Sequence, residues 1–199
     1  MRRGTYLLLT VWPLAGLAQD CDVALTAQAA PGTISVHYSA PCAPYAPVSV
    51  TYGPVTFGEE TGVDGQLDLT LPALSGVTTV RVQTGSAAHD LTLPPVADAQ
   101  RFVALVLPGD DAGAELSADA TQGQKFGFPG RAPQAWLLPV SAGALPVLSL
   151  PITGSTCGRR VALDLVDGRK GPRQQLEVTM PACSREGEVL HLPLVPAGG

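Results

Sequence analysis

The sequence is poor in charge, in lysine and in aromatic residues. Charged residues make up 15% of its 199 residues and aromatic residues 5%, and lysine occurs only at Lys125 and Lys170. Without Arg2 and Arg3, which we assign to a leader below, 10 basic residues stand against 17 acidic ones, a formal net charge of −7. An acidic chain repels nucleic acid and anionic lipid alike. We therefore expect no nucleic-acid partner and no basic binding face.

Long apolar runs are also absent. The run at residues 6–14 is interrupted by a proline and falls short of the roughly 20 residues that a membrane-spanning helix needs. Arg2 and Arg3 precede this run, and the small-x-small sequence Gly-Leu-Ala at residues 16–18 follows it, which is the pattern of a cleaved export signal. We predict a signal peptide at residues 1–18 and a mature protein without a membrane span, periplasmic or secreted.

Familiar catalytic and nucleotide-binding motifs are missing. The sequence has no Gly-x-Ser-x-Gly elbow, no His-Glu-x-x-His pair and no phosphate-binding Gly-Lys-Ser/Thr loop. Of its three histidines, His37 and His191 alternate with apolar residues and should point outward, and neighbours on a strand such as His89 and Asp90 point to opposite faces. The acidic residues within 110–119 lack the spacing of a calcium loop. We expect no enzyme, no metal and no cofactor.

The four cysteines fall into two segments with similar sequence patterns. These are "CDVALTAQAAPGTISVHYSAPC" (residues 21–42) and "CGRRVALDLVDGRKGPRQQLEVTMPAC" (residues 157–183). Each contains Val-Ala-Leu soon after its first cysteine, then a turn, then an alternating strand, then a proline-containing end at the second cysteine. Antiparallel strands joined by a turn bring their outer ends close together. We predict the disulfides Cys21–Cys42 and Cys157–Cys183, which imply an oxidising compartment.

Other roles for the cysteines fit less well. Gln19 and Asp20 stand before Cys21 where a lipoprotein signal has small residues, and lipidation would leave Cys42 without a partner. Zinc binding is disfavoured because neither pair has Cys-x-x-Cys spacing and no histidine lies near at ligand spacing. A thiol nucleophile would lack a base to activate it.

Apolar and polar residues alternate from end to end, which is typical of half-buried β-strands. In TISVHY (33–38), for example, every second residue is apolar, whereas RFVALVLPG (101–109) is apolar on both faces, as in a central sandwich strand. Residues 97–106 are the best local candidate for a helix. Further strands are predicted at VSVTY (48–52), QLDLTL (66–71), VTTVRVQT (77–84), HDLTLP (89–94), AWLLPV (135–140), ALPVLSLPI (144–152), VALDLV (161–166), QLEVTM (175–180) and EVLHLPLV (188–195).

The segment LPPVADAQ (93–100) interrupts this pattern with two prolines and small polar residues, so we place a domain boundary there. The predicted fold is all-β: two tandem small antiparallel β-sandwiches, at residues 19–95 and 99–196, behind the signal peptide. A single larger sandwich that encloses both cysteine hairpins is the alternative.

The segment "APVSVTYGPVTFGEETGVDGQLDLTLPAL" (46–74) resembles the carboxypeptidase-regulatory-like and transthyretin-like sandwich modules. The resemblance lies in a strand with a glycine turn, a Thr-Gly-x-Asp-Gly turn and an alternating strand ending in Leu-Pro-Ala-Leu. It covers about 30 residues and implies a fold rather than an activity. Such modules usually decorate other proteins and bind or brace them.

The whole chain resembles a set of uncharacterised exported bacterial β-sandwich proteins. The shared marks are SAPC (39–42), LPAL (71–74), TCGR (156–159) and MPAC (180–183). Such proteins sometimes carry the label "translocase". Here neither a channel nor a nucleotide motor fits, because the sequence lacks membrane spans and a phosphate-binding loop.

One stretch, "GQKFGFPGRAPQAW" (123–136), concentrates aromatic and basic residues in a chain that has few of either. Gly/Pro loops on rigid sandwiches often carry binding surfaces, and aromatic residues with arginine are typical interface anchors. The alternative is that its aromatic residues fold back to cap a small core. The candidate binding residues are Lys125, Phe126, Phe128, Arg131 and Trp136.

The sequence thus favours an exported, non-catalytic binding or accessory protein of the cell envelope, whose partner is another envelope or extracellular protein. A structural envelope component without a discrete ligand is the second hypothesis. A translocase-labelled protein or an enzyme of unknown chemistry is the third.

Overall fold

The computed structural model describes residues 21–108, 113–119, 121–141, 143–168 and 173–194. Within these residues the protein is all-β, as predicted, and its one helical element is the 3₁₀ turn η1 (Cys183–Arg185). The predicted signal peptide, residues 1–18, lies outside the described residues. No helix in the described part of the chain is long and apolar enough to cross a membrane.

The first sandwich consists of two facing antiparallel sheets, and its alternating strands bury one face each, so that Tyr38 and Tyr52 are almost fully buried. Their hydroxyls tie the sheets together: Tyr38 bonds the Thr84 hydroxyl (2.9 Å), and Tyr52 donates to the Pro72 carbonyl (2.8 Å). Burial raises the pKa of Tyr52 to about 12. Sheet 1 has the order β1 (Ala24–Ala30), β2 (Thr33–Ser39), β5 (Gln66–Pro72), and sheet 2 the order β4 (Val55–Glu60), β3 (Pro47–Tyr52), β6 (Thr79–Thr84), β7 (Ala87–Thr92).

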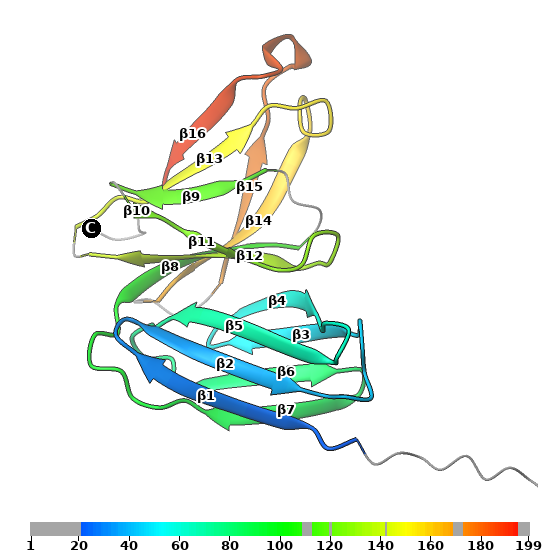
Figure 1. Ribbon diagram of the computed structural model, residues 1–199. Helices are drawn as coiled ribbons and strands as arrows, with labels where there is room; N and C mark the ends of the chain where they lie inside the picture. The colour runs from blue at the N-terminus through cyan, green and yellow to red at the C-terminus, as the bar shows by residue number, and fades with distance from the viewer. Residues whose placement is uncertain (1–20, 109–112, 120, 142, 169–172, 195–199) are drawn as a thin grey trace, which may run out of the picture.

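The second sandwich also has two facing antiparallel sheets. Sheet 3 has the order β11 (Gln124–Phe126), β12 (Gln134–Val140), β8 (Arg101–Leu107), β14 (Arg160–Asp167), β15 (Gln174–Thr179). Sheet 4 has the order β10 (Thr121–Gln122), β9 (Glu115–Ala118), β13 (Val147–Pro151), β16 (Val189–Pro193). Figure 1 shows the second sandwich standing on one side of the first, with β8 and β12 of sheet 3 next to the first sandwich.

Strand β8 is apolar on both faces because sheet 3 separates two cores. Phe102, Ala104 and Val106 join the core of the first sandwich, whereas Val103 and Leu105 join the core of the second. The prediction of a helix at residues 97–106 is therefore wrong, because this apolar run belongs to a strand that is covered on both sides.

Sheet 3 also covers the open side of the first sandwich. Strands β1 and β7 lie together on one side of that sandwich, which leaves the edges of β4 and β5 on the other. There the rings of Phe57 on β4 and Phe126 on β11 lie 5.2 Å apart. At the β5 edge, the Gln124 side chain donates to the Thr70 carbonyl (3.0 Å). The core of the first sandwich is consequently shared with sheet 3 of the second, and Phe57 and Phe126 both belong to it.

Both predicted disulfides are confirmed. Cys21–Cys42 joins the open ends of the β1–β2 hairpin, with the Cα atoms 5.7 Å apart, and Cys157–Cys183 joins those of the β14–β15 hairpin, with the Cα atoms 4.9 Å apart. No cysteine is free. Each bridge closes a hairpin that the alternating pattern and the turn residues had already predicted.

Because the core is shared, Phe126→Ala should destabilise the whole chain by about 3–5 kcal/mol and leave a single unfolding transition. Denaturant unfolding measured by far-UV circular dichroism and by Trp136 fluorescence checks this, since Trp136 reports on the second core. Coincident curves are expected. Two separated transitions, with only the first shifted by the substitution, would show two independent folding units instead.

Candidate functional site

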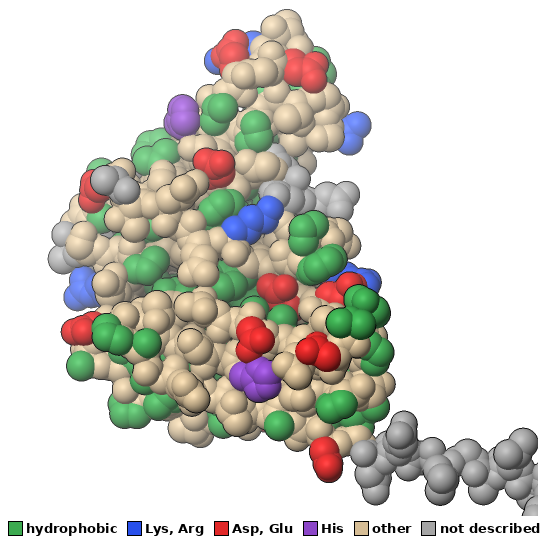
Figure 2. Space-filling model, in the orientation of Figure 1, with side chains coloured by type: hydrophobic (Ala, Val, Ile, Leu, Met, Phe, Trp, Pro, Cys, Tyr) green, Lys and Arg blue, Asp and Glu red, His purple; other side chains and the backbone are tan. Residues whose placement is uncertain are grey.

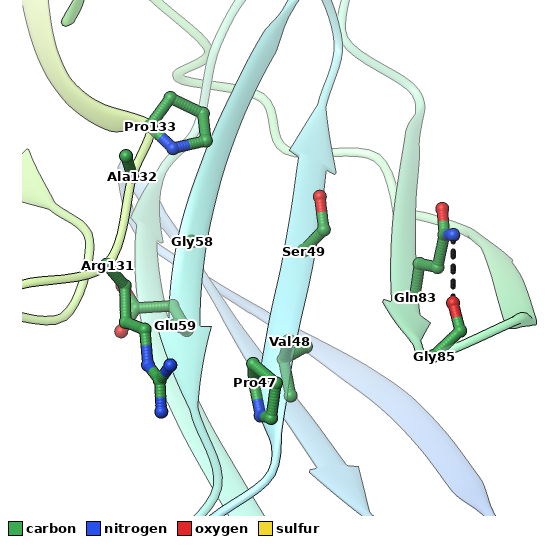
Figure 3. A pocket seen from close by; sticks show the side chains of 10 residues that line it. All are labelled: Pro47, Val48, Ser49, Gly58, Glu59, Gln83, Gly85, Arg131, Ala132 and Pro133. Atoms are coloured by element: carbon green, nitrogen blue, oxygen red, sulfur yellow. Dashed lines mark hydrogen bonds between the residues drawn. The ribbon is translucent and has the colours of Figure 1, made fainter. Parts of the chain in front are cut away.

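The loop between β11 and β12 runs along the free edge of β4 and pairs with it. The Gly58 N–H donates to the Pro133 carbonyl (2.7 Å), and the Phe128 N–H donates to the Gly58 carbonyl (2.8 Å). A Cβ at Gly58 would lie 3.0 Å from the Ala132 carbonyl oxygen, so glycine permits this close approach. Figure 3 shows Ala132 and Pro133 beside β4. The loop thus covers an edge that would otherwise be open to other strands.

The five residues predicted to form a binding loop lie in different environments. Phe126 is buried in the shared core, and Trp136 is buried in the core of the second sandwich. Lys125 is exposed and lies opposite Trp136 in the β11–β12 register. Phe128, 42% exposed, and Arg131 reach the surface beside β4. The structure thus places Phe128 and Arg131 together at the β4 edge and separates them from Phe126 and Trp136.

Two carboxylates of β4 hold this loop in place. Arg131 forms an ion pair with Glu60, and its Nε donates to Glu60 Oε2 at 3.2 Å. Glu59 Oε1 accepts the Gly127 N–H at 2.8 Å. Burial raises the pKa of Glu59, and the hydrogen bond from Gly127 opposes that shift only in part. Attachment of the second sandwich to the first is therefore partly electrostatic.

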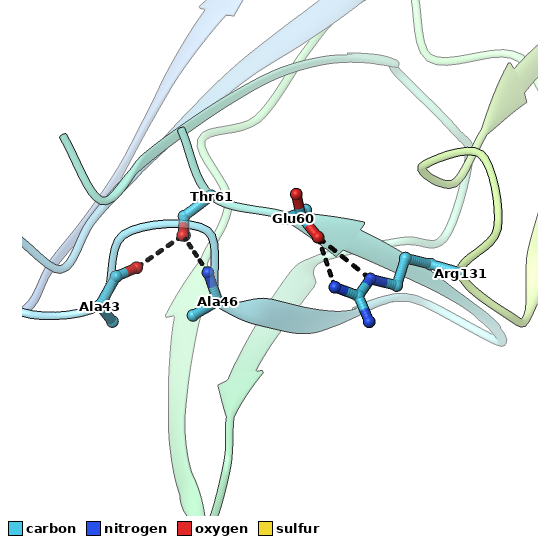
Figure 4. Close-up of polar contacts among 5 residues, drawn as sticks. All are labelled: Ala43, Ala46, Glu60, Thr61 and Arg131. Atoms are coloured by element: carbon cyan, nitrogen blue, oxygen red, sulfur yellow. Dashed lines mark hydrogen bonds and ion pairs between the residues drawn. The ribbon is translucent and has the colours of Figure 1, made fainter. Parts of the chain in front are cut away.

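A second loop, residues 40–46, is held next to the end of β4. The Thr61 side chain is buried; its hydroxyl donates to the Ala43 carbonyl (2.6 Å) and accepts the Ala46 N–H (2.8 Å). Figure 4 shows this clamp beside the ion pair of the first loop. The disulfide at Cys42 fixes the start of the same loop. The loop is consequently anchored at both ends.

Tyr45, within this loop, has the left-handed backbone conformation that bulky residues avoid, with φ of 53°. Its N–H donates to the Gly62 carbonyl (3.2 Å), yet its side chain is 61% exposed, and Val63, next to Gly62, is 72% exposed. Of the five large hydrophobic side chains exposed in the described residues, Tyr45, Val63 and Phe128 lie on loops around the end of β4. We define the β4-end surface as Tyr45, Glu60, Val63, Phe128 and Arg131.

Figure 2 shows this side of the molecule, where the two sandwiches meet at the right-hand edge of the view. Hydrophobic side chains gather there, with acidic and basic side chains between them. Contiguous exposed apolar patches often mark sites of protein–protein contact.

A shallow hollow of about 300 Å³ adjoins the β4-end surface on the outer face of sheet 2. Its floor is formed by Ser49, Gly58 and Gln83, which lie in register across three strands. Arg131 and Glu59 contribute to its lining, and Figure 3 shows the loop as the wall on the β4 side. Two of the floor residues, Ser49 and Gly58, are small and leave room for a side chain from a partner.

The sequence had not singled out Tyr45, Val63 or Glu60. Tyr45 carries a local signal, because it stands between Pro44 and Pro47 in a chain with few aromatic residues. The pairing of Glu60 with Arg131 carries none, since the two are 71 positions apart and a single sequence does not reveal the contact.

The three histidines lie on three different sheets. His37 Nδ1 lies 2.7 Å from Asp68 Oδ1 on sheet 1, and His191 Nδ1 lies 2.9 Å from Ser149 Oγ on sheet 4. His89, in β7 of sheet 2, faces inward toward the Tyr38 ring. No two histidines therefore converge on a common pocket in the described part of the chain.

The pair His37–Asp68 borders a second hollow, of about 270 Å³, whose other lining side chains are uncharged. Thr26, which lies opposite His37 in the β1–β2 register, and Ser35, two positions before His37 in β2, also line this hollow. The pair is a cross-strand contact on an exposed face.

Within the described residues, no group of three His, Cys, Asp or Glu side chains is placed to hold a metal ion. Asp110 and Asp111 lie outside those residues. No family model, no curated protein and no solved structure matches this chain.

Tyr45→Asn should raise the free energy of unfolding by about 1 kcal/mol, because asparagine tolerates the left-handed conformation that costs tyrosine energy. Urea unfolding measures the change. Val63→Asn, a substitution at an exposed neighbour without positive φ, should stay within about 0.5 kcal/mol of the parent. A loss of stability in the Tyr45 variant would mean that its ring is held by contacts in the folded chain.

Glu59→Gln should stabilise the protein at neutral pH. Because burial raises the pKa of Glu59, its contribution to stability is fully present below the unfolded pKa and is lost as the pH rises through the folded pKa. Glutamine removes the buried charge and can still accept the Gly127 N–H. The gain should shrink as the pH falls toward 4.5, the ordinary value for this carboxyl.

Glu60→Gln is the matched control, since it removes a charge from the adjacent residue but breaks the ion pair with Arg131. It should lower stability at neutral pH. Urea unfolding across the pH range compares the two variants, and equal losses from both would contradict the burial argument for Glu59.

Proposed function

We propose that this protein is an exported, non-catalytic binding or accessory protein of the cell envelope, periplasmic or secreted, and that it binds another protein through the β4-end surface. The observation that carries the proposal is the gathering of Tyr45, Val63 and Phe128, all exposed, on anchored loops around one strand end. Aromatic residues and arginine are the side chains that most often dominate binding energy at protein interfaces.

Export is supported by the two disulfides. Disulfides persist in oxidising compartments and are rare in the reducing cytosol. The predicted signal peptide at residues 1–18 agrees with this location.

Rigid presentation supports a binding role. The Thr61 clamp, the disulfide at Cys42 and the edge pairing of Gly58 fix the loops before any partner arrives. Association then costs little conformational entropy in these loops, which leaves more of the contact energy for affinity. A structural component without a discrete ligand would have no need for an exposed tyrosine in a strained conformation.

Non-catalytic action is supported by the dispersed histidines. General acid–base or nucleophilic chemistry needs groups within hydrogen-bonding reach of one another and of a substrate. The histidine pairs here lie on separate, exposed sheet faces.

The proposal predicts that the double variant Tyr45→Asn/Phe128→Ser loses at least about tenfold in capture of its partner, as expected when two interface anchors are removed. Crosslinking in cells followed by mass spectrometry of the captured proteins measures this. Far-UV circular dichroism and the unfolding midpoint should show that the variant is still folded.

Leu145→Ser is the control, because Leu145 is 56% exposed but lies between β12 and β13 in the second sandwich. It should capture the same protein as the parent. Equal capture by both variants, or no specific protein captured by the parent, would favour the structural component instead.

A further inference from the structure

In the first sandwich, acidic residues clearly outnumber basic ones. Residues 21–95 contain six acidic residues and one basic residue, Arg81. Arg81 is already engaged, since its Nε and Nη2 bond the Asp90 carboxylate at 2.6 and 2.8 Å. The first sandwich therefore presents an excess of negative charge.

Two of these acidic residues belong to segments next to Tyr45 and Val63. Asp64 follows Val63 directly and is exposed. Asp22, also exposed, follows Cys21. The disulfide joins Cys21 to Cys42, which stands three residues before Tyr45. Asp22 and Asp64 thus add exposed carboxylates beside the loops that carry Tyr45 and Val63.

The one basic residue of the β4-end surface does not reverse this balance. Arg131 is paired with Glu60, so their charges compensate. Glu59 is a further carboxylate of the same strand, and it accepts the Gly127 N–H of the loop.

We propose that the partner is a protein whose docking face carries an apolar pocket for Tyr45, rimmed by lysine and arginine. This rests on the proposed function, and it adds the chemistry of the partner. Charge complementarity supports it, because opposite potentials steer encounter and disfavour partners of like charge. The same carboxylates repel nucleic acid and anionic lipid surfaces.

The first step of the test places the photocrosslinking residue p-benzoylphenylalanine at position 45 in cells, with the same residue at position 145 as the control. Mass spectrometry identifies the protein captured at position 45 but not at position 145. That protein is then purified, and its binding to the disulfide-bonded mature chain is measured by surface plasmon resonance.

The proposal predicts that the association rate falls at least about tenfold between low salt and 0.5 M salt, while the dissociation rate changes little. The double variant Asp22→Asn/Asp64→Asn should slow association in low salt several-fold and weaken its salt dependence. The control Glu115→Gln/Glu186→Gln removes two carboxylates from the second sandwich and should leave both rates unchanged.

The outcomes separate this inference from the proposed function. If Tyr45→Asn abolishes binding but salt and the Asp22/Asp64 variant have no effect, the surface binds a protein and the basic rim is wrong. Equal effects of the two charge-removing double variants overturn the local charge argument in the same way. If position 45 captures no protein beyond those captured at position 145, or captures lipid or nucleic acid instead, both proposals fail.

Discussion

The pairing of the open edge of β4 with the second sandwich is the contact on which the rest of the structure depends. Strand β4 carries Val55 and Phe57 on its buried face, and the Phe57 ring lies against the Phe126 ring of sheet 3. Sheet 3 in turn has an apolar face, with Phe102 and Leu137, that the second sandwich does not bury in its own core. One contact therefore covers two apolar surfaces and closes one strand edge.

That contact also explains where the candidate binding surface lies. The loop that follows β11 must pass along β4 to complete the edge, so Phe128 and Arg131 are brought to the end of the strand. The loop that contains Tyr45 reaches the same place from the first sandwich, held by Thr61 and by a disulfide. The surface thus forms only where the two sandwiches meet, and its rigidity follows from the packing beneath it.

Alternation and turn residues predicted much of the fold. They predicted eleven of the strands, both cysteine hairpins and their disulfides, and the burial of both faces of β8. They missed β4 as an alternating strand because Gly58 and Glu59 interrupt its pattern, and both are there to accommodate the loop of the other sandwich. The short strands β9 to β11 contain too few residues for a period to show.

The candidate site was only partly visible in the sequence, because composition marks a stretch without saying which side chains become covered. The stretch 123–136 does contain two surface residues of the site, Phe128 and Arg131. Sheet 3, however, directs Phe126 into the core of the first sandwich and Trp136 into the core of the second. Tyr45 could not be placed from the sequence, since its exposure follows from a clamp by Thr61, 16 positions later, that only the folded chain reveals.

Native-state hydrogen exchange at the amides of Gly58 and Phe128 tests the central claim most directly, since these two groups make the bonds that join loop and edge. If the two sandwiches form one cooperative unit through this contact, both amides exchange only by global unfolding, with the same free energy of opening as amides in β3 and β8. Exchange of these two amides at a much lower opening free energy, while β3 and β8 stay protected, would show that the contact opens by itself and would contradict the account.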